Sequence, residues 1–181
     1  EHLQSRHRRE RWVLKSPGHL GPVAAMMAEY PDAMVVQTHR DPTRVVPSVS
    51  SLEYAMRCVS SDAVDAHALG RQQLRLWSEM LQQGLDARAS LPQHEGQFLD
   101  LHFHEIAADP VGCVARIYDH FGLSLTAEAE ARMRAFAASN PRDAHGAHRY
   151  TLAMFGLERA DVESAFKRYC ERFGVRPEAA E

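Results

Sequence analysis

The sequence predicts an α/β domain in which a parallel sheet is flanked by helices. Two short apolar runs carry this prediction, because each leads to a basic residue: Trp12–Leu14 to Lys15, and Met34–Thr38 to Arg40. Each run is followed by a turn that contains proline and then by apolar residues at helical spacing. The order of strand, basic residue, turn and helix therefore occurs twice, and a third strand is predicted over 98–103.

Length and composition are those of one globular domain, which we expect to span residues 1–181. The 181 residues are 45% hydrophobic and 25% charged, with a formal net charge of −3, so no global positive charge favours nucleic acid as a partner. No apolar run approaches the ~18 residues that a membrane span needs. The 3 cysteines without close spacing indicate a reducing cytoplasm, and the 11 scattered histidines predict no metal site.

The two ends of the chain are predicted to lie outside the core. Residues 1–11 are polar and rich in arginine, and we expect a linker or the end of an upstream helix there. Residues 176–181 are expected to form a frayed tail. Residue 1 is not methionine, and we expect this sequence to be the later part of a longer protein.

The first half of the chain shows clear boundaries between its elements. A Ser-Pro step ends the first predicted strand, Trp12–Lys15, and a helix over 19–29 follows. The second strand, Met34–Thr38, is almost continuously apolar, which is typical of a parallel strand covered on both faces. Asp41 is a good N-cap and Pro42 suits the first helical position, so the next helix begins there. A proline inside that helix predicts a kink or a late start.

The second half of the chain is predicted to contain the third strand and further amphipathic helices. Asp109 and Pro110 are expected to start a helix that Gly122 ends. The expected elements are a long helix over 62–90, a strand over 98–103, a helix over 110–121, a helix over 126–138, a polar loop over 141–150, and a last helix with Val162, Phe166, Tyr169 and Phe173 on its inward face.

Lys15 and Arg40 are predicted to lie at the carboxyl ends of parallel strands, beside helix N-termini. Basic side chains at such helix ends form an anion site, so the local pattern favours a protein that handles phosphate or sulfate. Arg40 supplies a planar fork of donors and Ser48 supplies a hydroxyl, which together suit a phosphate monoester. The simpler alternatives are a surface lysine at a strand end, and a surface pair of Arg40 and Asp41 beside an exposed serine.

An ordered set of motifs extends this pattern over nearly the whole chain. The motifs are Lys15–Leu20, Tyr30–Ala33, His39–Pro42 with Ser48, Asp100–Pro110, Arg142–Tyr150 and Phe155–Leu157. In these motifs the sequence resembles the sulfotransferases that use PAPS (3′-phosphoadenosine 5′-phosphosulfate). It is most similar to the bacterial branch related to tyrosylprotein sulfotransferases.

The resemblance implies a fold like that of the P-loop nucleotide hydrolases. It also implies transfer of a sulfuryl group from the donor co-substrate PAPS to a hydroxyl acceptor, without a metal. Lys15 would then be the catalytic cation, and Arg40 and Ser48 would hold the 3′-phosphate of PAPS. Phe103 would pack near the adenine. The family usually has tyrosine there, so the ring face is kept and the hydroxyl is absent.

The resemblance further implies a basic loop over the nucleotide phosphates, in which glycine permits close approach of the backbone. Its candidate residues are Arg142, His145, Gly146 and His148. Two elements of the family, the first phosphate loop and the general base, have no counterpart in the sequence. We expect both to precede Glu1, so that the fold is N-terminally incomplete and this chain alone is weak or inactive as a catalyst.

Two alternative functions remain compatible with the sequence. A kinase-like phosphoryl transferase would share this kind of sheet, although ATP lacks the 3′-phosphate that Arg40 and Ser48 suit. A non-catalytic nucleotide-binding remnant would keep the site without the chemistry. We expect the acceptor to be a small-molecule, lipid or carbohydrate hydroxyl in the bacterial cytoplasm, and the sequence does not predict the oligomeric state.

Overall fold

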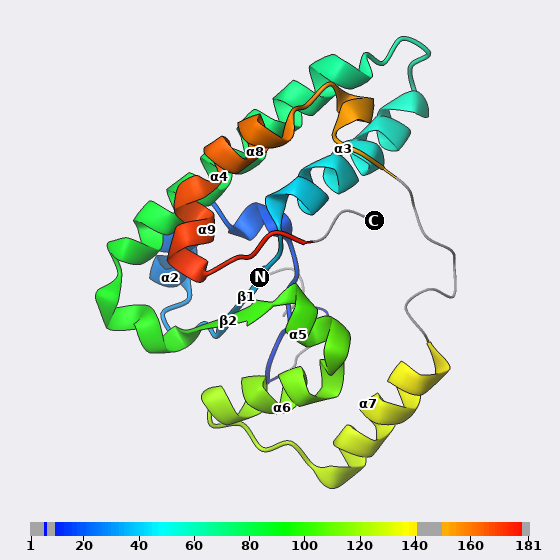
Figure 1. Ribbon diagram of the computed structural model, residues 1–181. Helices are drawn as coiled ribbons and strands as arrows, with labels where there is room; N and C mark the ends of the chain where they lie inside the picture. Colours follow the sequence, from blue (N-terminus) through cyan, green and yellow to red (C-terminus); the bar gives the residue numbers. More distant parts are fainter. Residues whose placement is uncertain (1–5, 7–9, 141–149, 179–181) are drawn as a thin grey trace.

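The structure of the protein is a computed structural model, in which residue 6 and residues 10–140 and 150–178 are described (Figure 1). The sheet in this part of the chain has two parallel strands, β1 (Val35–His39) and β2 (Phe98–His102), and His39 pairs with His102 at their carboxyl ends. The crossover between the strands contains α3 (Pro42–Cys58) and α4 (Ala66–Ala89). The prediction of an α/β fold with parallel strands and flanking helices is therefore confirmed.

The other elements are short helices on both sides of the strands. They are the 3-10 helices η1 (Pro17–His19), η2 (Pro92–Gln97) and η3 (Ala153–Phe155), and the α-helices α2 (Val23–Glu29), α5 (Phe103–Ala108), α6 (Pro110–His120), α7 (Ala127–Ser139), α8 (Arg159–Ala165) and α9 (Lys167–Phe173). In the view of Figure 1, α3, α4, α8 and α9 lie above the strands, α6 and α7 lie below them, and α5 follows the end of β2.

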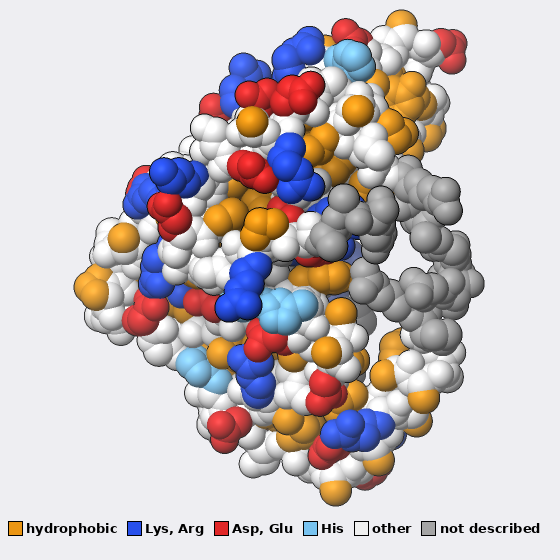
Figure 2. Space-filling model, viewed as in Figure 1, with side chains coloured by type: hydrophobic (Ala, Val, Ile, Leu, Met, Phe, Trp, Pro, Cys, Tyr) orange, Lys and Arg blue, Asp and Glu red, His pale blue; other side chains and the backbone are white. Residues whose placement is uncertain are grey.

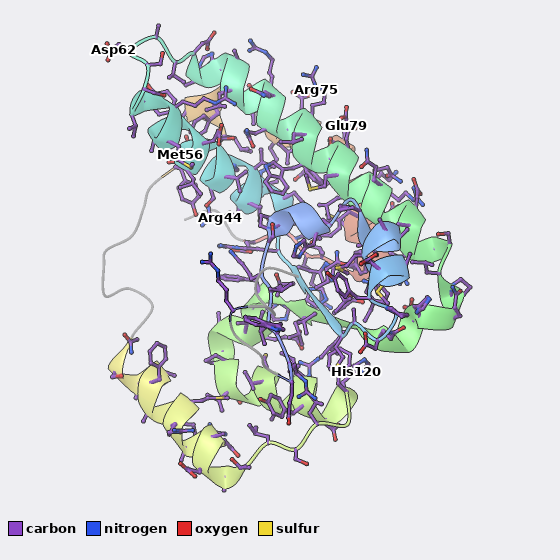
Figure 3. The ribbon with its side chains drawn as sticks, turned by 180° about the vertical axis from the view of Figure 1, so that it is seen from behind. Arg44, Met56, Asp62, Arg75, Glu79 and His120 are labelled. Carbon is purple, nitrogen blue, oxygen red and sulfur yellow. The ribbon has the colours of Figure 1, made fainter. Side chains whose placement is uncertain are left out.

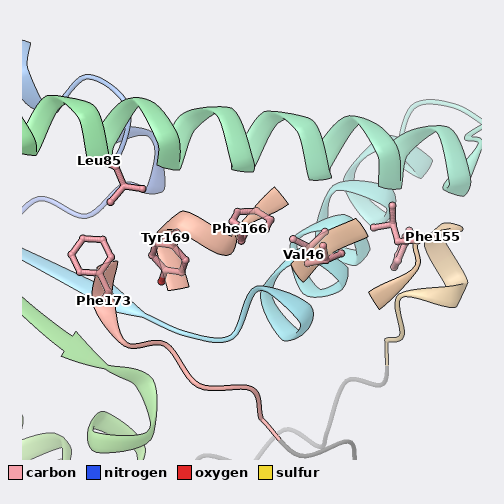
Figure 4. Close-up of a cluster of buried hydrophobic side chains, with 8 residues drawn as sticks. Val46, Leu85, Phe155, Phe166, Tyr169 and Phe173 are labelled. Atoms are coloured by element: carbon pink, nitrogen blue, oxygen red, sulfur yellow. The ribbon is translucent and has the colours of Figure 1, made fainter. Parts of the chain in front are cut away.

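The larger hydrophobic cluster lies between α4 and the last helices of the chain (Figure 4). Val46 of α3 and Leu85 of α4 contribute to it, and each large side chain buried there contributes roughly 1.5–3 kcal/mol. The other members are Phe155, Leu157, Val162, Phe166, Tyr169 and Phe173. The predicted inward stripe is therefore buried, although the predicted single last helix is divided into α8 and α9. A smaller cluster packs α2 on β2.

The helix boundaries predicted from Asp-Pro steps and from glycine are confirmed. Asp41 and Asp109 each accept a hydrogen bond from a backbone N–H group in the first turn, at 2.8 Å in both cases. Pro42 and Pro110 occupy the first helical positions of α3 and α6. Gly122, just after α6, adopts φ +63°, a conformation that favours glycine.

The predicted strand over Trp12–Lys15 is wrong. These residues belong to neither a helix nor a strand, and Val13 and Leu14 are 92% and 61% exposed. An extended segment becomes a strand only when a neighbouring strand pairs with its backbone groups. Among the described residues β1 and β2 pair only with each other, so the sheet has two strands in place of the predicted three.

Three smaller predictions also require correction. β1 alternates between half-buried and exposed residues before the buried His39, so it is not covered on both faces. Phe103 begins α5 instead of ending a strand, because His102 and Glu105 form a capping box at that point. The helix α3 begins at Pro42 and continues through Pro47, so of the two predicted alternatives, a kink or a late start, the late start is wrong.

Candidate functional site

The carboxyl ends of β1 and β2 place two of the predicted site residues next to each other. Arg40 follows β1 and Phe103 follows β2, and the strands are parallel with their last residues paired. Both residues therefore leave the sheet at the same edge. The guanidinium carbon of Arg40 lies 3.9 Å from the centroid of the Phe103 ring, which is a cation–π arrangement.

Arg40 stands directly before the N-terminus of α3, which adds its own partial positive charge. Asp41, which is 4% exposed, accepts a hydrogen bond from the backbone of Thr43 and so fixes where the helix starts. A second arginine, Arg44, lies in the first turn. Figure 3 labels Arg44 on the end of α3 nearest the sheet. Two guanidinium groups and a helix N-terminus therefore meet at one place, as an anion site requires.

A carboxylate of the protein itself is bound at this place. Arg40 donates to Glu178 through Nε at 2.8 Å and through Nη2 at 2.9 Å, which is a bidentate pair. Arg44 Nε lies 4.0 Å from the same carboxylate, and the backbone N–H of Glu178 donates to Asp41 Oδ2 at 2.7 Å. The hydrogen bond from Arg40 lowers the pKa of Glu178, although burial opposes that shift. The site therefore favours a negatively charged ligand.

A buried polar network holds the end of β1 that precedes Arg40. His39, which is 1% exposed, contacts Asp100 of β2 through Nε2 at 2.8 Å and the Tyr169 hydroxyl through Nδ1 at 3.1 Å. Arg88 of α4 donates to both oxygens of Asp100, at 2.7 and 3.0 Å. Because Arg40 follows His39 directly, these contacts fix the backbone from which the Arg40 side chain projects.

The pKa shifts in this network agree with its hydrogen bonds. Burial by itself would raise the pKa of Asp100, but hydrogen bonds from His39 and Arg88 outweigh it and hold that pKa well below its ordinary value. Burial raises the pKa of Tyr169 well above its ordinary value, and a hydrogen bond from the Arg40 backbone partly offsets this. At neutral pH Asp100 is therefore charged and Tyr169 is neutral.

The structure does not show the remaining predicted site residues in contact with Arg40 or Phe103. Lys15 is exposed on the extended segment before η1, and Ser48 is half-buried on α3. Neither side chain makes a hydrogen bond or an ion pair with another residue of the described ranges. The remaining candidates, Arg142, His145, Gly146 and His148, lie in 141–149, outside the described residues.

Sequence reasoning missed Arg44, Glu178 and the role of Asp100. Arg44 had a usable signal, because it follows Arg40 by four residues in the first turn of a predicted helix. Asp100 also had a signal in the sequence, because a single carboxylate in an otherwise apolar strand needs a polar partner when it is buried. Glu178 had none, because nothing in its neighbourhood in the sequence points to Arg40.

Three further features concern metals, membranes and thiols. In the part of the chain that the structure describes, no group of three or more histidine, cysteine, aspartate or glutamate side chains is placed to hold a metal ion. None of the helices traced there is long and apolar enough to cross a membrane. Cys58, Cys113 and Cys170 are free thiols.

The fold and the site define an α/β protein in which Arg40, at the carboxyl end of β1, holds a carboxylate of the same chain beside the N-terminus of α3. A family model described as a sulfotransferase family matches residues 1–127, which is more than half of the chain. The protein belongs to this sulfotransferase family, as the motifs of the sequence predicted.

Solved structures and curated relatives agree with this assignment. The crystal structure of sulfotransferase STF9 from Mycobacterium avium has a TM-score of 0.83 and 29% identity, and the match covers 93% of this chain and 43% of that one. The crystal structure of sulfotransferase STF1 from Mycobacterium tuberculosis has a TM-score of 0.71 and 38% identity, with coverage of 89% and 40%. The predicted sulfotransferase fold is therefore confirmed.

Among curated proteins, the chain is similar to the omega-hydroxy-beta-dihydromenaquinone-9 sulfotransferase Stf3 of Mycobacterium bovis and of Mycobacterium tuberculosis. Each is 24% identical over 168 residues, which is 92% of this chain. The chain spans only 42% of the length of these relatives.

Proposed function

We propose that the protein is a PAPS-dependent sulfotransferase, and that this chain carries the side of the nucleotide site that binds the 3′-phosphate. The observation that carries the proposal is the bidentate hold of Arg40 on a carboxylate, beside the N-terminus of α3 and against the Phe103 ring. A terminal phosphate offers a similar pair of acceptor oxygens with more negative charge. Membership of the sulfotransferase family supports the same function.

Each described site residue has a distinct role in this proposal. Arg40 binds and orients the 3′-phosphate, Arg44 adds positive charge from the next turn, and Ser48 supplies a hydroxyl donor. Phe103 offers a ring face to the adenine and holds the Arg40 guanidinium in place. The Lys15 ammonium stabilises negative charge on the leaving phosphate. When bound, PAPS supplies the sulfuryl group that is transferred to the acceptor oxygen.

The acceptor and the cellular setting are part of the proposal. Stf3 is named for a hydroxylated menaquinone, so a lipid hydroxyl is the acceptor class to test first, ahead of small-molecule and carbohydrate hydroxyls. The mycobacterial relatives and the free thiols support a bacterial, cytoplasmic protein. The four candidates of the 141–149 segment are proposed to contact the nucleotide phosphates. The family match counts against a kinase-like activity.

Calorimetric titration with adenosine 3′,5′-bisphosphate, the product form of the donor, tests the site. Arg40→Ala should weaken binding by roughly tenfold to a hundredfold, because it removes two charge-assisted hydrogen bonds. The matched control is Arg57→Ala, which removes another arginine of α3, one that pairs with Glu53. Adenosine 5′-monophosphate, which lacks the 3′-phosphate, should bind the wild type and Arg40→Ala about equally.

The titration separates the proposal from its alternatives. If Arg40→Ala binds the bisphosphate as tightly as Arg57→Ala does, the 3′-phosphate is not bound at Arg40. If the bisphosphate binds through Arg40 but no sulfuryl transfer from PAPS occurs even in the protein extended to the length of its relatives, the chain is a nucleotide-binding remnant. ATP that displaces the bisphosphate at equal concentration would favour a kinase-like protein.

A further inference from the structure

The segment that follows α9 returns to the start of α3. Gly174 adopts φ +62° and ends α9, and the backbone N–H of Val175 bonds back to Cys170 at 3.0 Å. Val175 then packs against the larger hydrophobic cluster. This anchor directs the chain away from α9, and Glu178 reaches the residues around Arg40. Residues 176–178 belong to the segment that the sequence predicted to be frayed.

Glu178 makes two independent contacts at the anion site. Its carboxylate occupies the fork of Arg40 at 2.8 and 2.9 Å, while its backbone N–H donates to Asp41 Oδ2 at 2.7 Å. Asp41 uses its other oxygen to cap α3, at 2.8 Å from the backbone nitrogen of Thr43. One carboxylate therefore fixes both the start of α3 and the position of Glu178. The Glu178 carboxylate is thus aimed at the group that the proposed function assigns to the 3′-phosphate.

A guanidinium edge that is engaged by one bidentate anion cannot engage a second anion in the same way. The Nε and Nη2 donors of Arg40 are both taken by Glu178. A phosphate that needs this edge must therefore displace the carboxylate. The exchange is feasible, because the Arg40 and Glu178 side chains are 24% and 32% exposed, and a phosphate monoester carries more charge than a carboxylate.

We propose that Val175–Glu178 form an internal latch, in which the Glu178 carboxylate takes the place of the nucleotide 3′-phosphate on Arg40 and is displaced when the nucleotide binds. This inference rests on the proposed function. Only molecules with an open latch can bind the nucleotide, so the apparent affinity of the site equals its intrinsic affinity multiplied by the open fraction. It also keeps the Arg40 guanidinium paired and oriented when no nucleotide is present.

Two measurements on the whole chain test the latch together. The first is calorimetric titration of adenosine 3′,5′-bisphosphate into the wild type, Glu178→Gln, Glu178→Ala and Glu178→Asp. Removing the competing carboxylate should tighten binding by about threefold to tenfold, in which tenfold corresponds to about 1.4 kcal/mol. Glu178→Asp keeps the charge on a shorter side chain and should give an intermediate value. The matched control is Glu130→Gln on α7, which removes the partner of Arg134 and one negative charge.

The second measurement is amide hydrogen exchange at Glu178, whose N–H is bonded to Asp41 in the latched form. This amide should be protected in the nucleotide-free wild type and lose protection when the bisphosphate is saturating. The latch would be overturned if the Glu178 variants bind the bisphosphate no more tightly than Glu130→Gln, or if the protection of the Glu178 amide does not change on binding. In either case, binding that depends on Arg40 would leave the proposed function in place. If the bisphosphate binds neither the wild type nor any variant, the proposed function fails, and competition by the latch fails with it.

Discussion

The exchange of Asp100 for asparagine is the perturbation for which the structure gives the clearest expected magnitude. Asp100 accepts hydrogen bonds from His39 and from two nitrogens of Arg88, and the Arg88 side chain is only 5% exposed. Asparagine keeps one acceptor oxygen but removes the charge and points an NH₂ group at a donor. Arg88 then remains buried with its main counter-charge gone.

Removing one partner of a fully buried ion pair costs about 3–5 kcal/mol. The Asp100 side chain is 31% exposed, and Arg88 keeps a hydrogen bond to Gln37 at 3.0 Å, so the cost should be reduced. We expect Asp100→Asn to lower the free energy of unfolding by about 2–3 kcal/mol, which is a large part of a typical total of roughly 5–15 kcal/mol. In urea, with a slope of about 2 kcal/mol/M, the midpoint should fall by about 1–1.5 M.

Urea unfolding followed by circular dichroism measures this change. The matched control is Asp86→Asn, because Asp86 pairs with Arg168 at 2.6 Å but both side chains are more than half exposed. Exposed pairs contribute at most about 1 kcal/mol, so the control should move the midpoint by less than about 0.5 M. An Asp100→Asn midpoint no lower than that of Asp86→Asn would refute the argument that the buried network holds the ends of the strands.

The remaining predictions concern the packing at Gly70, the stability of the protein in acid, and the Tyr169 hydroxyl that contacts His39 at the end of β1. Gly70→Ala should destabilise the protein by about 1–3 kcal/mol, because the added Cβ would overlap the carbonyl oxygen of Phe155, and this cost outweighs the gain of up to about 1 kcal/mol in helix propensity. The control is Gly96→Ala, whose added Cβ meets no atom within 4 Å, and thermal unfolding distinguishes the two variants. The lowered pKa of Asp100 means that the charged carboxylate stabilises the fold above its unfolded pKa of about 4, and that this stabilisation is lost as the pH falls further. Between about pH 5 and pH 2 the free energy of unfolding of the wild type should therefore fall more steeply than that of Asp100→Asn, and equal slopes would contradict this. Tyr169→Phe should cost about 1–2 kcal/mol in urea unfolding, because the buried partners of its hydroxyl lose a hydrogen bond, and a loss below about 0.3 kcal/mol would show that water replaces it.

Much of the fold could be predicted because it depends on signals between neighbouring residues. The start of α3 follows from Asp41 and Pro42, whose cap and fixed backbone angle act within one turn. The end of β1 before Arg40, and its proximity to Phe103, follow from the parallel arrangement that alternating strands and helices favour. These two residues were predicted as site residues and the structure brings them into contact.

Other predictions failed because the sequence pattern was only a necessary condition. The apolar run Trp12–Lys15 has the composition of a strand, but a strand also needs a paired neighbour, and the described residues supply none on that side. Val13 and Leu14 are therefore exposed, although their residue types favour burial. Figure 2 shows hydrophobic side chains of other segments on the surface as well, mixed with charged groups.

The sequence by itself determined the longer helices α3, α4, α6 and α7, the start of several helices, and the basic residue that follows β1. These features are set by caps, periodicity and turn residues that act over a few positions. Only the tertiary structure decided that Asp100 joins His39 and Arg88, and that Glu178 lies on Arg40 across a sequence separation of 138 residues. Such contacts depend on the path of the whole chain, because long-range ion pairs form wherever packing brings the charges together. No local pattern specifies that path.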